Sequence, residues 1–175
     1  MTTSSTWVAR AVERPSGSLV AEERELLRGL LAWHRATLLH KCAGLSPAEL
    51  ATRSVEPSGL SLLGLLRHLR KVERIWWRTR VAGEDVEPLH GFGAGEAHDF
   101  LQADPETAQE DYEALLEEWA VCDRVAARYA LDDEFGAGQD RFSLRFVHLH
   151  LIGEYARHNG HADLLRERVD GVVGA

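Results

Sequence analysis

Apolar residues recur at intervals of three and four along four long stretches of this 175-residue chain. The stretches run from about residue 19 to 43, from 61 to 81, from 104 to 130 and from 143 to 169. This spacing gives a helix one continuous apolar face, whereas a half-buried strand would alternate apolar and polar positions. The pattern therefore predicts an all-α protein folded as a four-helix bundle, with no clear strand.

Polar residues and turn formers mark the ends of these helices. Gly44 follows the first helix, as a C-terminal glycine often does. Ser46 is followed by a proline and, three residues on, by Glu49, which is the arrangement of a capping box. A short extra helix is therefore expected to about residue 53. Asp104 and Ser143 stand where side chains cap the third and fourth long helices.

The same period predicts which side chains face the core. The inner face of the second helix is expected to hold leucines together with His68 and Trp76. Five basic residues are expected to spread over its outer face: Arg67, Arg70, Lys71, Arg74 and Arg78. In the third helix, Leu116 is expected inside, and Glu117 and Glu118 are expected to face water.

Three segments lack a helical period. Residues 1–18 are polar and are expected to form a flexible N-terminal arm, so that residues 19–175 form a single domain. Residues 83–103 are rich in Gly, Asp, Glu and His, and residues 132–141 form a second loop. A connection as long as 83–103 is uncommon in a compact domain and often has a function, for example as a lid.

The bulk composition is ordinary for a globular domain, with 45% hydrophobic and 27% charged residues. The formal net charge is −8 and no block of Lys or Arg is present, which argues against nucleic acid or an anionic membrane surface as a partner. No apolar run is long enough for a signal peptide or a membrane span, so neither is expected. The two cysteines lack metal-ligand spacing, which fits a reducing, cytoplasmic compartment.

An acid and a histidine interrupt the apolar face of the fourth helix. Glu154 and His158 are four residues apart, so they lie one turn apart on the face that Val147 and Leu151 begin. A carboxylate is costly to bury unless a proton, a counter-charge or a metal ion accompanies it. His68 of the second helix is also expected to face inward, among leucines, and could supply a third ligand.

Two interpretations of these residues remain open on spacing alone. In the first, His68, Glu154 and His158 bind a divalent metal ion and leave open positions, as a catalytic rather than a structural site does. The absence of cysteine ligands is compatible with Zn, Ni, Fe or Mn. In the second, Glu154 pairs with Arg157 or with an arginine of the second helix, and the histidines are hydrogen-bonded core residues.

Other residues near this face have less defined roles. His161 lies one turn further along and is expected at the rim, although a contact with a ligand or a substrate is an alternative. His150 lies one turn before Glu154 and could be a fourth ligand or a packing residue. Asp163 could hydrogen-bond a metal-bound histidine, but a solvent-facing ion pair is the expectation. Gly153 costs helix stability in mid-helix, which suggests either a closely approaching neighbour or simple tolerance.

Two segments resemble the signature segments of a known superfamily. Residues 61–77 are SLLGLLRHLRKVERIWW, and residues 149–167 are LHLIGEYARHNGHADLLRE. Both are similar to characteristic helices of the DinB/YfiT-like superfamily and, within it, to the actinobacterial DUF664 branch, which is mycothiol-transferase-like. The resemblance extends over roughly residues 22–171, nearly the whole chain.

The resemblance implies a four-helix bundle with a divalent metal ion at one end. Matched residue by residue, the ligands are His68, Glu154 and His158, and zinc is the first choice of metal, with Ni, Fe or Mn as alternatives. The implied function is that of a metal-dependent S-transferase or isomerase. It would use mycothiol or a similar low-molecular-weight thiol as cosubstrate and would act on a small electrophile. A metal-bound thiol is held as its thiolate, which is the nucleophilic form.

The sequence leaves two other functions open and also bears on the quaternary structure. The alternative is a non-catalytic bundle that binds metal or a small molecule in a stress or secondary-metabolism role; it would be expected to lack a ligand, whereas all three are present. A metal-dependent hydrolase is a third possibility, but no further general base is evident. A homodimer is expected, because relatives often pair through helices and because Trp76 and Trp77 cannot both face one core.

Overall fold

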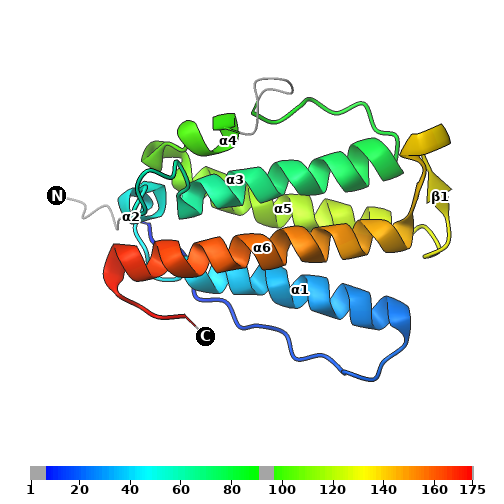
Figure 1. The fold of residues 1–175 in the computed structure, drawn as a ribbon, viewed down its shortest axis with the longest axis horizontal. Coiled ribbons are helices and arrows are strands. Elements are labelled where there is room, and N and C mark those ends of the chain that lie inside the picture. Colours follow the sequence, from blue (N-terminus) through cyan, green and yellow to red (C-terminus); the bar gives the residue numbers. More distant parts are fainter. Residues whose placement is uncertain (1–6, 91–96, 175) are drawn as a thin grey trace.

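The computed structural model describes residues 7–90 and 97–174, with only the backbone described at residues 97 and 98. Four long helices make up the predicted bundle: α1 (Glu23–Cys42), α3 (Leu62–Glu73) with its π-helical continuation (Arg74–Val81), α5 (Ala108–Ala126) and α6 (Leu144–Asp170). α6 packs against α1 and α3, and α3 packs against α5 (Figure 1). The all-α class predicted from the sequence is confirmed. In these two ranges, no helix is both long enough and apolar enough to cross a membrane.

Short elements connect the long helices. The predicted capping box is present at α2 (Pro47–Ala51), where the Ser46 side chain accepts from the Glu49 N–H and the Glu49 carboxylate accepts from the Ser46 N–H. The remaining short elements are α4 (Ala97–Leu101), 3₁₀ turns at Pro105–Thr107 and Gly138–Asp140, and β1 (Glu134–Phe135) paired antiparallel with β2 (Phe142–Ser143). Each strand has only two residues, too few to leave an alternating pattern in the sequence.

The second long helix buries a different tryptophan from the one predicted. Its buried positions after residue 68 come every four residues: Leu69, Glu73, Trp77 and Val81. Four residues are more than one turn of an α-helix, so buried positions at this spacing would drift around the helix axis. The π-helical segment has more residues per turn and keeps these positions on one side. As a result, Trp77 is 1% exposed and lies in the core, while Trp76 is only partly buried. Trp76, predicted on the inner face, packs against the core from a partly buried position, and Trp77 is the fully buried tryptophan of this helix.

Two charged residues predicted to face water are buried in ion pairs. Arg67 is 8% exposed, and its Nη1 donates to Asp111 Oδ2 at 2.8 Å. Glu118 is 3% exposed and accepts hydrogen bonds from Arg74, at 2.6 and 2.9 Å, and from Arg78, at 3.2 Å. A buried charge persists only with such partners. The helical period places these residues off the apolar stripe, but it cannot show that the α3–α5 contact covers them.

A second set of buried polar contacts joins all four long helices. Arg35 of α1 donates from Nε and Nη2 to the two carboxylate oxygens of Glu73, both at 2.7 Å, and from Nη1 to Asp123 of α5 at 2.7 Å. Trp119 Nε1 of α5 donates to the hydroxyl of Tyr155 on α6 at 2.7 Å. Because removing one partner would leave a buried charge unpaired, these contacts favour one mutual alignment of the helices.

The described part of the N-terminal segment lies against the bundle. Ala9 is 2% exposed, its N–H donates to the Leu45 carbonyl at 3.0 Å, and its carbonyl accepts from the Gly44 N–H at 2.8 Å. The Trp7 ring meets the Tyr112 ring edge-on at 5.6 Å. Of the arm expected from the sequence, the first six residues lie outside the described part of the chain, and the residues around Ala9 contact the core.

Candidate metal centre

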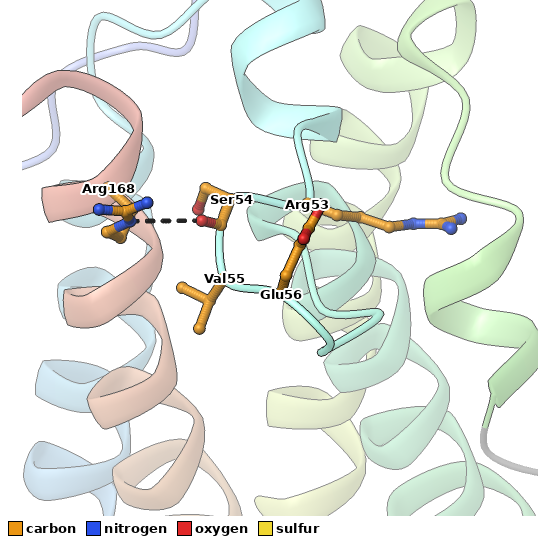
Figure 2. Close-up of a pocket in the computed structure, with 5 residues that line it drawn as sticks. All are labelled: Arg53, Ser54, Val55, Glu56 and Arg168. Carbon is orange, nitrogen blue, oxygen red and sulfur yellow. Dashed lines mark hydrogen bonds between the residues drawn. The ribbon is translucent and has the colours of Figure 1, made fainter.

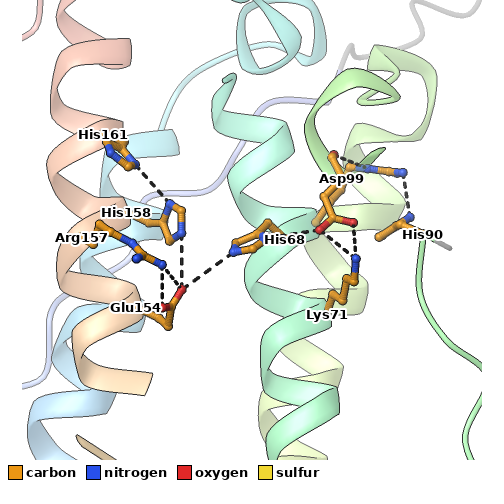
Figure 3. Close-up of polar contacts among 9 residues, drawn as sticks. His68, Lys71, His90, Asp99, Glu154, Arg157, His158 and His161 are labelled. Carbon is orange, nitrogen blue, oxygen red and sulfur yellow. Dashed lines mark hydrogen bonds and ion pairs between the residues drawn. The ribbon is translucent and has the colours of Figure 1, made fainter. Parts of the chain in front are cut away.

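Helix α6 carries two of the three candidate ligands. The helix begins after Ser143, whose side-chain oxygen accepts from the Phe146 N–H at 3.2 Å, and it ends at Gly171, whose φ of 78° is the left-handed conformation of a C-terminal glycine. Glu154 and His158 lie one turn apart on the side of α6 that faces α3 (Figure 3). His158 is 6% exposed, and the side chain of Glu154 is 15% exposed.

Helix α3 presents the third candidate ligand to the other two. His68 lies in the second turn of α3, in a run of buried residues, and is 9% exposed. Its Nε2 lies 3.9 Å from Glu154 Oε2, and His158 Nε2 lies 3.6 Å from the same oxygen. One ligand atom from each residue lies within 4.8 Å of the other two. Around a zinc ion with bonds of about 2.1 Å, ligand atoms would be about 3.4 Å apart, so small side-chain rotations would suffice.

The protonation pattern fits a metal ion between the three residues. His158 Nε2 is buried and has no hydrogen-bond partner, although it points towards Glu154. Burial, together with the neighbouring His68, Arg157 and His161, lowers the pKa of His158 to about 3. The imidazole is therefore neutral at pH 7, which is the form that binds metal ions. Two imidazole nitrogens and one carboxylate oxygen form a donor set that suits zinc and other divalent transition metals.

The ion pair proposed as the alternative interpretation is also present. Arg157 Nη2 lies 2.6 Å from both carboxylate oxygens of Glu154. Arg157 is on the solvent side, with its side chain 59% exposed, and an ion pair of this kind contributes little to stability. Because Glu154 Oε2 also faces both imidazoles, the contact with Arg157 does not remove the carboxylate from the candidate site.

His161 and His150 occupy different surroundings. His161 Nδ1 lies 3.3 Å from His158 Nδ1, so one of the two nitrogens can donate to the other. If His158 donates, its Nε2 keeps a free lone pair on the side of Glu154. His150 packs against the rings of Trp76, at 4.5 Å, and Phe146, at 5.8 Å. The predicted group of three is thus brought together, His161 contacts His158, and His150 lies among aromatic side chains.

The sequence did not reveal the partner of His68 on its other side. Asp99 of α4 is fully buried, and its Oδ2 lies 3.2 Å from His68 Nδ1 and 3.2 Å from Lys71 Nζ (Figure 3). Burial raises the pKa of this carboxyl, but the hydrogen bonds from His68 and Lys71 and the charge of Lys71 lower it below its ordinary value overall. Asp99 lies in the stretch without helical period, where no spacing rule connects an acid to a histidine 31 residues earlier.

The remaining polar residues discussed for this face have other partners. Asp163 forms an ion pair with Lys41 at 2.5 Å, so it does not serve either of the candidate imidazoles. His34 of α1 accepts a hydrogen bond at its carbonyl from Asn159 Nδ2 at 3.0 Å.

A cavity of about 440 Å³ lies between the loop that follows α2 and the last turns of α6 (Figure 2). Its lining consists of Arg53, Ser54, Val55, Glu56 and Arg168. Arg168 Nε donates to the Ser54 carbonyl at 3.4 Å across this cavity, whereas the guanidinium of Arg53 points away from it and donates to the Leu101 carbonyl at 2.6 Å. None of the three candidate ligands lines this cavity.

A family model described as mycothiol-S-transferase matches residues 26–171, a range that contains all four long helices except the first turn of α1. No curated protein and no solved structure matches the chain.

Proposed function

The chain belongs to the mycothiol-S-transferase family, a DinB/YfiT-like family, and on that premise we propose a metal-dependent transfer of a mycothiol-like thiol to a small electrophile. His68, Glu154 and His158 would hold the metal ion, with zinc as the first choice. The observation that carries the proposal is the convergence of two imidazole nitrogens on one carboxylate, one of them buried without a partner. Within this proposal, the alternative reaction is an isomerisation that uses the same thiol.

A bound divalent ion would supply the means to hold a thiol as its thiolate at neutral pH. The chain's own residues prepare the site for this role. His158 is kept neutral by burial, and Glu154 is kept between the two imidazoles while Arg157 covers its solvent side.

The thiol would have to come from outside the protein. Both cysteines are free and buried, and burial raises the pKa of Cys42 to about 12 and that of Cys122 further still. A buried thiol that stays protonated is a poor nucleophile. This supports a low-molecular-weight thiol as cosubstrate, and the two free cysteines also support the proposed cytoplasmic location.

The test begins with the metal content of the purified protein. We expect about one divalent ion per chain by elemental analysis, and we expect His158→Ala and Glu154→Gln to lose it, because each removes one of three ligands. His40→Ala is the matched control, since His40 is on the exposed side of α1. The same variants should lose conjugation of mycothiol to an aryl halide. Protein that carries no stoichiometric metal, with variants as active as wild type, would show the proposal to be wrong.

We also propose that the protein forms a homodimer, as expected from the sequence. The support is the outward face of α6, which is largely apolar between Phe146 and Leu164 and which no other described element covers.

A further inference from the structure

Helix α4 lies on the first half of α3, in a stretch where the sequence shows no helical period (Figure 1). It packs closely because position 64 is a glycine. A Cβ at Gly64 would lie 3.0 Å from Phe100 Cδ1 and 3.1 Å from Phe100 Cα, which is tighter than ordinary contact. The absence of a side chain at Gly64 therefore allows the α4 backbone to lie directly against α3.

Two side chains of α4 contact the imidazole of His68. The Phe100 ring stacks on the His68 ring, with centroids 5.1 Å apart and planes inclined by 29°. Asp99 Oδ2 lies 3.2 Å from His68 Nδ1. The imidazole is thus held at one face by an aromatic ring and at one edge by a carboxylate, and its remaining nitrogen, Nε2, points to Glu154 (Figure 3).

Asp99 is itself fixed in place. It is 0% exposed, its carboxylate accepts from Lys71 Nζ at 3.2 and 3.3 Å, and its backbone carbonyl accepts from Arg67 Nε at 3.3 Å. A carboxylate that is buried and held in this way can accept the Nδ1–H of His68 and so selects the tautomer with a free lone pair at Nε2. A carboxylate on the far nitrogen of a metal-bound histidine orients the ring and raises its basicity.

We propose that Asp99 is a positioning residue that orients His68 for metal binding, so that α4 contributes a functional side chain to the metal centre. This inference rests on the proposed function, because it needs His68 to be a ligand. It assigns a role to one acid within the long connection between α3 and α5.

Zinc binding to the metal-free protein tests the proposal, measured by competition with a chelating indicator at fixed pH. We expect the zinc Kd of Asp99→Ala to rise about 10- to 100-fold over wild type, as for other partners of metal-bound histidines. Asp99→Asn should show a smaller rise, because its amide oxygen still accepts from His68 Nδ1. This variant keeps the side chain's shape and carries the test if Asp99→Ala does not fold.

Lys71→Met is the matched control. It removes the ion pair of Asp99 but keeps the hydrogen bond to His68, so a merely structural ion pair predicts equal effects for Lys71→Met and Asp99→Ala. We expect the zinc Kd of Lys71→Met to stay at or below that of wild type. As a second readout, the visible absorption of the cobalt-substituted protein should change in Asp99→Ala and not in Lys71→Met.

The possible outcomes distinguish the proposed role of Asp99 from the proposed metal-dependent function. Stoichiometric zinc in wild type, with Asp99 variants that bind zinc as tightly as wild type or weaken no more than Lys71→Met does, would overturn the role of Asp99 and leave the metal centre standing. A wild-type protein that binds no zinc, nickel, iron or manganese would overturn both.

Discussion

At the scale of single residues, His148 is a buried histidine that has no role in the candidate metal centre. It is 2% exposed, its ring meets that of Trp77 at 5.0 Å, and neither ring nitrogen has a hydrogen-bond partner. Burial, together with the nearby Arg24 and Arg35, lowers its pKa to about 4. A histidine kept neutral in this way lowers the stability of the fold when the pH falls.

The direction of this pH dependence follows from proton binding at His148 in the folded and unfolded states. Between about pH 6.5 and pH 4 the unfolded chain binds a proton at His148 and the folded chain does not, so stability rises with pH across this window. We expect His148→Leu to reduce the loss of stability between pH 7.5 and 5.5 by about 1 kcal/mol, as measured by urea unfolding at each pH. His40→Leu, on the exposed side of α1, is the control. Parallel pH profiles for wild type and His148→Leu would contradict this prediction.

The ligand set itself shows how residue-scale chemistry and the fold combine. His68, Glu154 and His158 were predicted from their places on inward faces and from a resemblance, and the structure brings them together. Their role as metal ligands stays a prediction. The alternative pairing of Glu154 with Arg157 is present as well, and the two interpretations turned out to be compatible.

At the scale of elements, the contact between α3 and α4 can be tested away from the ligands. Alanine in place of a mid-helix glycine normally stabilises a helix by about 0.5–1 kcal/mol. We expect Gly29→Ala in α1, where a Cβ would meet nothing within 4 Å, to show this gain. Gly64→Ala should show no gain, because its Cβ would press on the backbone of α4.

Gly64→Ala should also weaken zinc binding, although residue 64 is not itself a candidate ligand. If α4 moves away, His68 loses the contacts to Asp99 and Phe100 that orient it, and a rise of the zinc Kd of about tenfold is expected. The measurements are thermal unfolding and zinc competition on the same variants. A Gly64→Ala protein that is as stabilised as Gly29→Ala and binds zinc normally would show that α4 does not hold the site.

At the scale of the whole molecule, the outward face of α6 is the candidate contact between two copies. Its large apolar side chains are exposed, with Leu149 at 54% and Leu164 at 58%. Between them lie Gly153, Ala156 and Gly160, all exposed. A Cβ at Gly153 or Gly160 would meet nothing within 4 Å, so no neighbour among the described residues explains the mid-helix Gly153.

The order of these residues suits an antiparallel pair. Leu149 precedes Gly153 by four residues, and Gly160 precedes Leu164 by four. In a two-fold pair centred between residues 156 and 157, Leu149 of one copy would face Leu164 of the other, and Gly153 would face Gly160. A two-fold interface needs this kind of self-complementarity, and small residues let two helices approach closely.

We expect wild type to have twice the chain mass of 19.5 kDa in light scattering after size exclusion, and the double variant Leu149→Glu/Leu164→Glu to be a monomer. A charge at these positions would have to be buried in the interface without a partner. Leu116→Glu on α5 is the control, because Leu116, predicted inside, is 38% exposed on a different face. A wild-type mass of 19.5 kDa at every concentration tested would contradict the dimer.

The sequence by itself determined the helices and the direction of most of their side chains. Ser46, Ser143 and Gly44 mark helix ends, and the apolar period places His68, Glu154 and His158 inward. These features depend on residues close together in the chain, so spacing alone can predict them.

Only the tertiary structure decided which distant groups meet. Asp99 reaches His68 from a stretch without a period, Glu118 is buried by an arginine cluster, and Trp77 replaces Trp76 in the core because the helix widens. Each depends on how two elements pack or on a local change of helical pitch. Contacts of this kind are selected by the total free energy of the packed bundle, and no local periodicity records them.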